Sequence, residues 1–353
     1  MLNNGVEVVH YGHYEVDLTP AIRQVSKANH RRILLQFPDG LRPLAWSVAN
    51  KFMEHGVEVV VSADPCYGAC DLAYGELETL NCDLIIHLGH VPPHRNYKGK
   101  ALFIEVRCKL PVKDALEDSL KYLDKYRKIG VAASIQHIHN VSDACSFLER
   151  HGKQPLVGKA SNHAVYDGQI LGCDLTTALT IAHSVDAFIV ISGGLFHGIG
   201  VQLATNKPVV VADPYLGKAK PIGEYAEKFV KLRRGAEKKF LEAKRVGIII
   251  GLKHGQNKMG EARLLFRRLK NLGRNPVMIC AREITPENMD SFTELDAFIN
   301  TACPRIAIDG RNLFQKPILN SDEVKPILDL LDEAYEEEKI GDAPGAGSRP
   351  PQP

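Results

Sequence analysis

The stretch RRILLQF at residues 31–37 begins with two arginines and then turns apolar, as an interior strand of a parallel sheet does. Two later stretches have the same character, KIGVAAS at residues 128–134 and KRVGIII at residues 244–250. A helix-like stretch follows each of the three. The chain therefore contains three beginnings of a βα unit, and such a repeat bears directly on the fold.

Each of these three units continues with further strands in one fixed order. Second strands are predicted at residues 57–62, 155–159 and 276–279, third strands at 82–87, 185–190 and 295–300, and closing strands at 101–106, 207–212 and 316–319. Every third strand has an aspartate near its start, namely Asp83, Asp186 or Asp296. Strands that alternate with helices predict right-handed βαβ units on a parallel sheet. We therefore expect an α/β protein of three similar parallel-sheet domains, produced by internal triplication and arranged around a central site.

The predicted domain boundaries follow from where the repeats end. They place domain 1 at residues 1–110, domain 2 at 111–225, domain 3 at 226–339 and a disordered Gly/Pro-rich tail at 340–353. The second join, residues 224–245, is rich in lysine and arginine. It is either an electrostatic patch for an acidic protein or a solvated connecting helix, and its interleaved glutamates favour the solvated helix.

Composition excludes several classes of protein. With 44% hydrophobic and 24% charged residues, the chain is not largely disordered, and its net charge of +2 does not indicate a nucleic-acid binder. No apolar run approaches the ~18 residues that span a bilayer, and residues 1–18 lack the apolar core of a signal peptide. We therefore expect a cytoplasmic protein with no membrane partner, whose eight cysteines are reduced, catalytic or metal-binding.

One cysteine per domain falls where an open parallel sheet binds its ligands, beyond the carboxyl ends of the strands. Cys66 lies in DPCYGACD at residues 64–71, Cys173 in YDGQILGCD at 166–174, and Cys303 in NTACPR at 300–305. Three domains around a centre could bring these thiols together. Three thiolates without a fourth ligand suit a [4Fe–4S] cluster with one open iron, but catalytic zinc also takes three protein ligands. The spacing favours neither metal.

The remaining cysteines and a group of histidines receive structural interpretations. Four cysteines are interpreted as small buried apolar residues: Cys82, Cys108, Cys145 and Cys280. Cys70 is ambiguous, because it follows Cys66 by four residues and could face the same site. Three histidines, His87, His90 and His94, span a strand end and a loop irregularly, and we interpret them as solvated or structural.

Four motifs taken together resemble the diphthamide synthesis family: residues 64–71, GGLFH at 193–197, DPY at 213–215, and residues 300–305. The resemblance extends from about Gln36 to Pro317 and is nearest to the single-subunit archaeal members. It implies a homodimer of three-domain subunits, each holding a [4Fe–4S] cluster through Cys66, Cys173 and Cys303. It also selects Cys66 over Cys70 as the ligand, and no residue beyond the three cysteines is predicted to be catalytic.

The resemblance also implies a reaction. S-adenosylmethionine is the co-substrate, and the reduced cluster cleaves its bond between sulfur and the methionine γ-carbon. The resulting 3-amino-3-carboxypropyl radical adds to the imidazole C2 of a histidine in translation elongation factor 2, leaving methylthioadenosine. An unidentified electron donor is required. Residues expected to contact S-adenosylmethionine are Gly193, Gly194, His197 and Gln256, since the turn at 193–200 and the loop at 253–256 could supply donors to its carboxylate.

Three other functions stay open. A quinolinate synthase-like enzyme also joins three α/β domains around a three-cysteine cluster, but the motif at residues 64–71 argues against it. A non-catalytic subunit could carry the cluster for electron transfer or as a scaffold, although the presence of all three cysteine loops favours a competent enzyme. A zinc-binding hydrolase on the same fold is the third alternative, and the identity of the metal would decide it.

Overall fold

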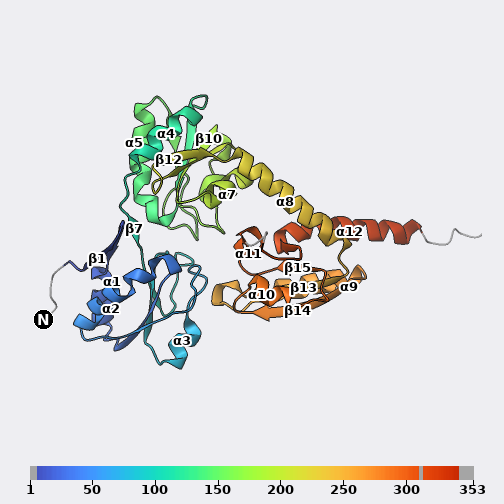
Figure 1. Cartoon of the computed structure of the whole chain (residues 1–353), viewed down its shortest axis with the longest axis horizontal. Helices are drawn as coiled ribbons and strands as arrows, with labels where there is room; N and C mark the ends of the chain where they lie inside the picture. The colour runs from blue at the N-terminus through green and yellow to red at the C-terminus, as the bar shows by residue number, and fades with distance from the viewer. Residues whose placement is uncertain (1–5, 310–312, 342–353) are drawn as a thin grey trace, which may run out of the picture. The chain divides into compact units, whose positions relative to one another are not determined.

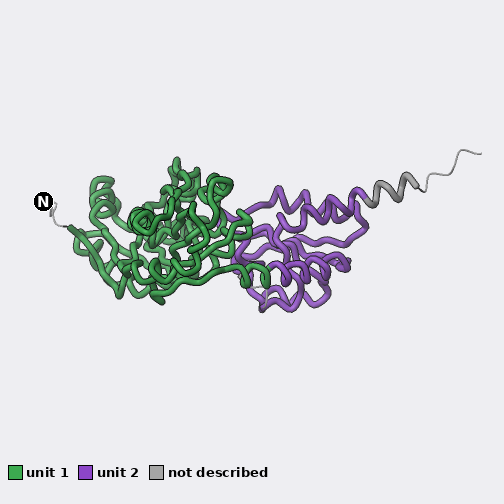
Figure 2. Tube along the Cα trace, turned by 90° about the horizontal axis from the view of Figure 1, so that it is seen from above, with its two compact units in different colours: residues 1–229 green, residues 230–353 purple. Residues whose placement is uncertain are grey.

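The computed structural model describes residues 6–309 and 313–341, and many of its helices and strands are labelled in Figure 1. Two compact units divide the chain: unit 1, residues 1–229, and unit 2, residues 230–353 (Figure 2). Unit 1 contains two parallel-stranded sheets and unit 2 contains one. The chain is therefore α/β, as predicted, while the finer limits of the three domains stay a prediction.

Three sheets have the same strand order. In each of the three sequence repeats, the first strand lies between the second and the third strand of that repeat. The first sheet has the order β4 (Glu58–Val61), β3 (Arg32–Gln36), β5 (Leu84–Leu88), β6 (Ala101–Ile104). The second has the order β9 (Gln154–Leu156), β8 (Lys128–Ala133), β10 (Ala187–Ile191), β11 (Val209–Asp213), β12 (Lys218–Pro221). The third, in unit 2, has the order β14 (Asn275–Ala281), β13 (Arg245–Gly251), β15 (Ala297–Asn300), β16 (Ile318–Asn320). The twelve predicted strands therefore occur, in the predicted order.

Four short strands were not predicted. The strand β12 adds an antiparallel edge to the second sheet. The hairpin of β1 (Val8–Tyr11) and β2 (Tyr14–Asp17) pairs with β7 (Arg107–Cys108) in a separate antiparallel sheet. These strands bury only alternate or isolated side chains, so their sequences lack the continuous apolar run of the central strands.

Helices connect the strands. The α-helices are α1 (Thr19–Lys27), α2 (Ala45–Glu54), α3 (Tyr74–Thr79), α4 (Lys113–Leu123), α5 (Val141–Arg150), α6 (Thr176–Leu179), α7 (Phe196–Thr205), α8 (Gly223–Glu242), α9 (Met259–Asn271), α10 (Pro286–Asp290), α11 (Arg305–Asp309) and α12 (Ser321–Gly341). The 3-10 turns are η1 (Asp39–Leu44), η2 (Ile135–Asn140), η3 (Ala182–Ser184) and η4 (His254–Gln256). Within the described residues, no helix is both long enough and apolar enough to cross a membrane.

A glycine in the first strand makes room for a phenylalanine in the third strand of two sheets. Gly130 pairs with Phe188, and Gly247 pairs with Phe298. A Cβ atom on Gly130 would lie 2.3 Å from Phe188 Cε1, and one on Gly247 would lie 2.7 Å from Phe298 Cδ1. Both phenylalanines are fully buried, so the two recurring residue types form one packing unit that is used twice.

The aspartate that recurs at each third strand ties that strand to the start of the first. Asp83 Oδ2 accepts hydrogen bonds from the backbone N–H groups of Arg31 and Arg32, at 2.7 and 3.0 Å. Asp186 and Asp296 accept the equivalent pairs of bonds at residues 127–128 and 244–245. Backbone hydrogen bonds lower the pKa of all three carboxyl groups. The repeat thus has a structural cause, which is satisfaction of the strand-start amides.

We expect Asp296→Ala to destabilise unit 2 by about 1 kcal/mol, because two backbone N–H groups lose a charged acceptor that is partly exposed to solvent. The pKa of Asp296 is lowered in the fold, so its contribution is present above the unfolded value near 4 and is lost as pH falls further. Urea unfolding at pH 7 and at about pH 2 measures both effects. Asp296→Asn keeps one acceptor oxygen and should cost less; equal stability of all three proteins at pH 7 would contradict this role.

The structure corrects three predictions. Cys82 and Cys108 are buried as expected and Cys145 is half-buried, but Cys280 is exposed because it lies on β14, an edge strand. The join at residues 224–245 is helical, yet Arg233 within α8 is buried rather than solvated. The helix α12 continues to Gly341, two residues into the predicted tail, and residues 342–353 lie outside the described part of the chain.

Candidate functional site

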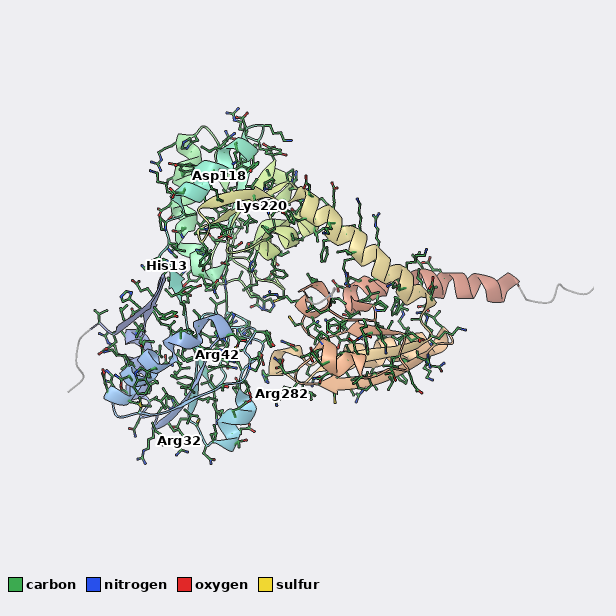
Figure 3. The ribbon with its side chains drawn as sticks, viewed as in Figure 1. His13, Arg32, Arg42, Asp118, Lys220 and Arg282 are labelled. Carbon is green, nitrogen blue, oxygen red and sulfur yellow. The ribbon has the colours of Figure 1, made fainter. Side chains whose placement is uncertain are left out.

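Cys66 lies in the loop between β4 and α3, beyond the carboxyl end of the first sheet, and its side chain is buried. The loop is closed by the backbone N–H of Asp71, which donates to Gly68 O at 3.0 Å. Arg42 of η1 (Figure 3) braces the loop's start, since its Nη2 donates to Ala63 O at 2.8 Å. The first cysteine loop is therefore ordered by bonds from its own residues and from the neighbouring strand-end turn.

A buried chain of polar side chains also reaches this loop. Gln36 Nε2 donates to Asp71 O at 2.7 Å, and Gln36 Oε1 lies 3.0 Å from His87 Nδ1. His87 Nε2 in turn lies 2.9 Å from His90 Nδ1. Burial holds the pKa of His87 well below its ordinary value, with a further contribution from His90, and lowers the pKa of His90 to about 4. Both rings are therefore neutral at pH 7, and His87 and His90 are structural, as one of the two interpretations of the sequence held.

In two neutral rings, each imidazole has one N–H donor and one acceptor nitrogen. Gln36 donates its amide to Asp71 O, so its oxygen accepts from His87 Nδ1–H. His87 Nε2 must then accept from His90 Nδ1–H. In these three hydrogen bonds each donor therefore points the same way: His90 donates to His87, His87 donates to Gln36, and Gln36 donates to the backbone of the Cys66 loop.

Cys173 is exposed and lies between β9 and α6. The neighbouring Asp174 fixes the loop, because its Oδ1 accepts from Thr176 N–H at 2.8 Å and its Oδ2 accepts from Ser161 Oγ at 2.7 Å. Burial raises the pKa of Asp174, but hydrogen bonds from Thr176 and Ser161 outweigh burial, so the pKa lies below its ordinary value. Asp174 thus bonds to the N–H of the first residue of α6, while Leu175 is the N-cap residue of this helix and makes no side-chain capping bond.

Hydrogen bonds connect the Cys173 loop to the end of the first sheet within unit 1. Arg95 N–H donates to Asn162 O at 3.0 Å, and His163 Nδ1 lies 2.6 Å from Pro93 O. Both contacts join the segment after β5 to the segment that precedes Cys173. Because the segment after β5 also contains His90, the loops that carry Cys66 and Cys173 belong to one hydrogen-bonded edge of unit 1.

Cys303 lies in unit 2 directly after β15 and is partly exposed. Asn300, the last residue of that strand, donates from Nδ2 to Cys303 O at 2.8 Å and to Asn320 Oδ1 at 2.7 Å. Asn320 Nδ2 donates to Pro304 O at 3.1 Å. The third cysteine loop is therefore held by two buried carboxamides at the ends of adjacent strands.

The glycine turn at residues 193–194 follows β10 and precedes α7, as predicted. Gly194 has a φ of +69°, which favours glycine, and a Cβ atom on Gly193 would lie 2.8 Å from the ring of Tyr215. Asp213 Oδ2 accepts from Gly194 N–H, and Asp213 Oδ1 accepts from Tyr215 N–H, both at 2.9 Å. One of the amides expected to cradle an anion is thus already bonded to a carboxylate.

The two other residues expected to contact the co-substrate lie in different units. His197 is in the first turn of α7, with its ring 5.3 Å from that of Phe196 in an edge-on arrangement. Gln256 is buried in η4 of unit 2, where its N–H donates to Lys253 O at 2.9 Å. The buried Lys253 ammonium pairs with Glu283 Oε1 at 2.8 Å, so its charge is balanced within the unit.

His137 gives unit 1 a pH dependence near this edge. The residue is 1% exposed, and its ring lies 5.5 Å from that of Tyr215. Burial, and to a smaller extent His139, lower the pKa of His137 to about 4, although Asp213 acts in the opposite direction. The unfolded chain binds a proton near pH 6.5, so the stability due to neutral His137 is complete above pH 6.5 and falls as pH drops toward 4.

We expect His137→Phe to reduce the loss of unfolding free energy between pH 7 and pH 5 by roughly 2 kcal/mol. The phenylalanine keeps a ring against Tyr215 but does not titrate. Urea unfolding monitored in unit 1 at the two pH values measures the difference. His87 and His90 are present in both proteins and contribute equally to the pH dependence of the unfolding free energy in each. His13 is exposed (Figure 3), so His13→Gln is the control variant. An unchanged pH dependence in His137→Phe would show that His137 titrates normally.

The three cysteines thus lie in loops that follow strands: Cys66 and Cys173 after the second strands β4 and β9 in unit 1, and Cys303 after the third strand β15 in unit 2. Among the residues that the structure describes, no three His, Cys, Asp or Glu side chains form a preassembled metal site. Three thiols on separate, ordered loops nevertheless match the donor set of a three-cysteine iron–sulfur cluster. Sequence reasoning missed the side chains that order the loops, Gln36, His87, Asn300, Asn320 and Asp213; the available signal was a polar residue ending an apolar strand.

Known proteins resemble the chain over most of its length. The model of the diphthamide synthesis protein family matches residues 37–340, a range that contains all three cysteine loops. The 2-(3-amino-3-carboxypropyl)histidine synthase of Pyrococcus horikoshii is 30% identical over 338 residues, covering 96% of this chain and 97% of that protein. Subunit 1 of the synthase of the same name from Saccharomyces cerevisiae is 27% identical, covering 93% of this chain and 77% of that protein. The crystal structure of Dph2 from Pyrococcus horikoshii with a 4Fe-4S cluster has a TM-score of 0.82 at 30% identity, covering 92% of each chain.

Proposed function

Because the chain belongs to the diphthamide synthesis family, we propose that it catalyses the first step of diphthamide synthesis. In this step a 3-amino-3-carboxypropyl group moves from S-adenosylmethionine to the imidazole C2 of a histidine in translation elongation factor 2. The observation that carries the proposal is the presence of three ordered cysteine loops at strand ends, in a chain similar throughout to a protein crystallised with a 4Fe-4S cluster.

Cys66, Cys173 and Cys303 would hold the cluster, one thiolate from each sheet. A [4Fe–4S] cluster with three protein ligands, when bound, supplies single electrons and one iron open to a further ligand. The chain's contribution would be to keep that iron open, because one cysteine from each of three loops would serve as a ligand. The neighbouring Cys70 is the alternative ligand in the first loop, four residues beyond Cys66.

S-adenosylmethionine would be oriented by Gly193, Gly194, His197 and Gln256. The absence of a side chain at Gly193 lets Tyr215 approach the turn, and Asp213 fixes the turn through Gly194 N–H. A fixed turn would hold the methionine moiety of S-adenosylmethionine in one orientation, and the orientation of the co-substrate would determine which of its bonds to sulfur is cleaved. We further propose that the protein works as a homodimer and receives its electron from a separate donor.

The proposal is tested by purification without oxygen, followed by measurement of iron, labile sulfide and zinc. We expect about four iron and four sulfide per chain, with an absorbance band that bleaches on reduction. Reduced protein with S-adenosylmethionine should release methylthioadenosine, and added elongation factor 2 should gain the mass of one 3-amino-3-carboxypropyl group. Omitting the reductant is the control and should abolish both products.

The outcomes separate the alternatives. Zinc, or no metal after anaerobic reconstitution, would overturn the proposal, and zinc would favour the hydrolase. A cluster without methylthioadenosine would indicate Lewis-acid chemistry of the quinolinate synthase kind, or a subunit that carries electrons. Release of 5′-deoxyadenosine in place of methylthioadenosine would show that a different bond of S-adenosylmethionine is cleaved.

A further inference from the structure

Two pairs of buried polar residues lie at the last or next-to-last position of adjacent parallel strands, one pair in each unit. In unit 2, Asn300 of β15 is in register with Asn320 of β16. In unit 1, Gln36 of β3 is in register with His87 of β5. All four side chains are at most 5% exposed. Burying a polar side chain destabilises the folded state unless the side chain is hydrogen-bonded. The hydrogen-bond partners of each pair therefore indicate its structural role.

The side chains of Asn300 and Asn320 form hydrogen bonds with the backbone of the Cys303 loop. Both Nδ2 hydrogens of Asn300 are used, one on Cys303 O and one on Asn320 Oδ1, and its Oδ1 accepts from Ala302 N–H at 3.1 Å. Asn320 completes the set by donating to Pro304 O at 3.1 Å. Three consecutive residues of the loop are thus bonded to two side chains that the sheet holds in place.

The pair of Gln36 and His87 is likewise hydrogen-bonded to the backbone of the Cys66 loop, through Gln36. Gln36 donates to Asp71 O at 2.7 Å, and its amide cannot rotate freely because its oxygen is bonded to His87 Nδ1 at 3.0 Å. His87 is itself packed against the ring of Phe103, at 5.1 Å between centroids. The orientation of the amide that holds the loop is therefore set by packing on the next strand.

We propose that these two strand-end pairs are positioning residues, which hold the backbone of the Cys66 and Cys303 loops so that their thiols are preorganised for the cluster. The inference rests on the proposed function in so far as these cysteines are cluster ligands. Its physical basis is that each loop carbonyl would lose a buried donor if the pair were removed, and that supporting bonds of this kind orient metal ligands. The two pairs act in separate units, so their effects should be separate.

The test uses apo-protein and two neutral near-isosteres, Asn300→Leu and Gln36→Met. Alkylation rates of individual cysteines with iodoacetamide are followed by mass spectrometry of peptides. We expect Asn300→Leu to raise the rate at Cys303 roughly tenfold, the effect of losing about 1.4 kcal/mol of protection against local opening, and to leave Cys66 unchanged. Gln36→Met should raise the rate at Cys66 by a similar factor and leave Cys303 unchanged, so each variant is the control for the other.

A second readout follows anaerobic reconstitution: the electron paramagnetic resonance signal of the reduced cluster should differ from that of the parent in both variants. Equal alkylation rates in all three proteins would overturn the inference. Equal acceleration at both cysteines in either variant would also overturn it, since that pattern indicates general destabilisation. If Asn300→Leu does not fold, Asn320→Leu removes the bond to Pro304 O and the acceptor for Asn300, and is judged by the same criteria.

The alkylation result does not depend on the cluster, so the two proposals fail separately. A parent protein that takes up no iron would refute the proposed function, while loop-specific alkylation would still be measured. A parent that assembles the cluster, with unchanged alkylation in both variants, would refute the positioning role alone.

Discussion

Replacement of Cys303 by alanine is expected to abolish cluster assembly and methylthioadenosine formation, and Cys66→Ala and Cys173→Ala should do the same. A cluster held by three thiolates has no protein ligand to spare. Loss of a supporting residue around a metal typically costs about 10–100-fold in metal affinity or activity, so loss of a ligand should cost more than about a hundredfold. Iron and sulfide analysis together with product quantification after anaerobic reconstitution measures both effects.

Two other cysteines provide controls for this experiment. Cys280→Ala should keep full iron content and activity, because Cys280 is exposed on the edge strand β14. Cys70→Ala decides the ambiguity in the first loop, and we expect it to retain the cluster. If Cys70→Ala loses the cluster while Cys66→Ala retains it, the ligand of the first loop is Cys70. Any one of the three ligand variants with full iron and full product would remove that cysteine from the set.

The central strands could be predicted because their residues are buried on both faces. The strands β5, β10 and β11 are buried at every position, and a continuous apolar run is a strong local signal. Edge strands carry a weaker signal: β9 spans only Gln154–Leu156 and is partly exposed, whereas the sequence predicted residues 155–159. The hairpin of β1 and β2 pairs with β7, about ninety residues away in the chain, and no local pattern reports such a pairing.

The cysteine loops could be predicted for a topological reason, since residues after parallel strands meet at one edge of the sheet. The residues that order those loops could not. A single polar residue such as Asn300 at the end of an apolar run has the same local pattern whether its amide faces solvent or a neighbouring strand. Only the register, which pairs Asn300 with Asn320, shows that the amide is buried and bonded. Arg233 is a second example: the local pattern of residues 224–245 predicted a solvated helix, but the Arg233 side chain is buried.

Arg233→Ala is expected to destabilise unit 2 by about 3 kcal/mol, the lower end of the usual cost of removing one partner from a buried ion pair, because the Glu323 side chain is 21% exposed. Arg233 is 5% exposed, and its Nε donates to Glu323 Oε1 at 2.6 Å. Its two Nη groups donate to Ala307 O and Ile318 O, at 2.9 and 3.0 Å. The variant would leave two carbonyls without this donor, and the Glu323 carboxylate would keep only the N–H of Asn320 from among its donors in the described part of the chain, at 2.8 Å from Oε2. Denaturant unfolding monitored in unit 2 measures the loss.

The matched control is Arg234→Ala, because Arg234 is the next residue of α8 and is exposed; we expect a change within about 0.5 kcal/mol. The double variant Arg233→Met with Glu323→Leu asks a sharper question, whether the pair itself stabilises the fold. Replacing a buried ion pair with apolar residues is often neutral, because both desolvated charges are removed together. Here the guanidinium also donates to two backbone carbonyls, which the double variant leaves unsatisfied. We therefore expect only partial recovery, and full recovery would show that the carbonyl contacts of Arg233 contribute little.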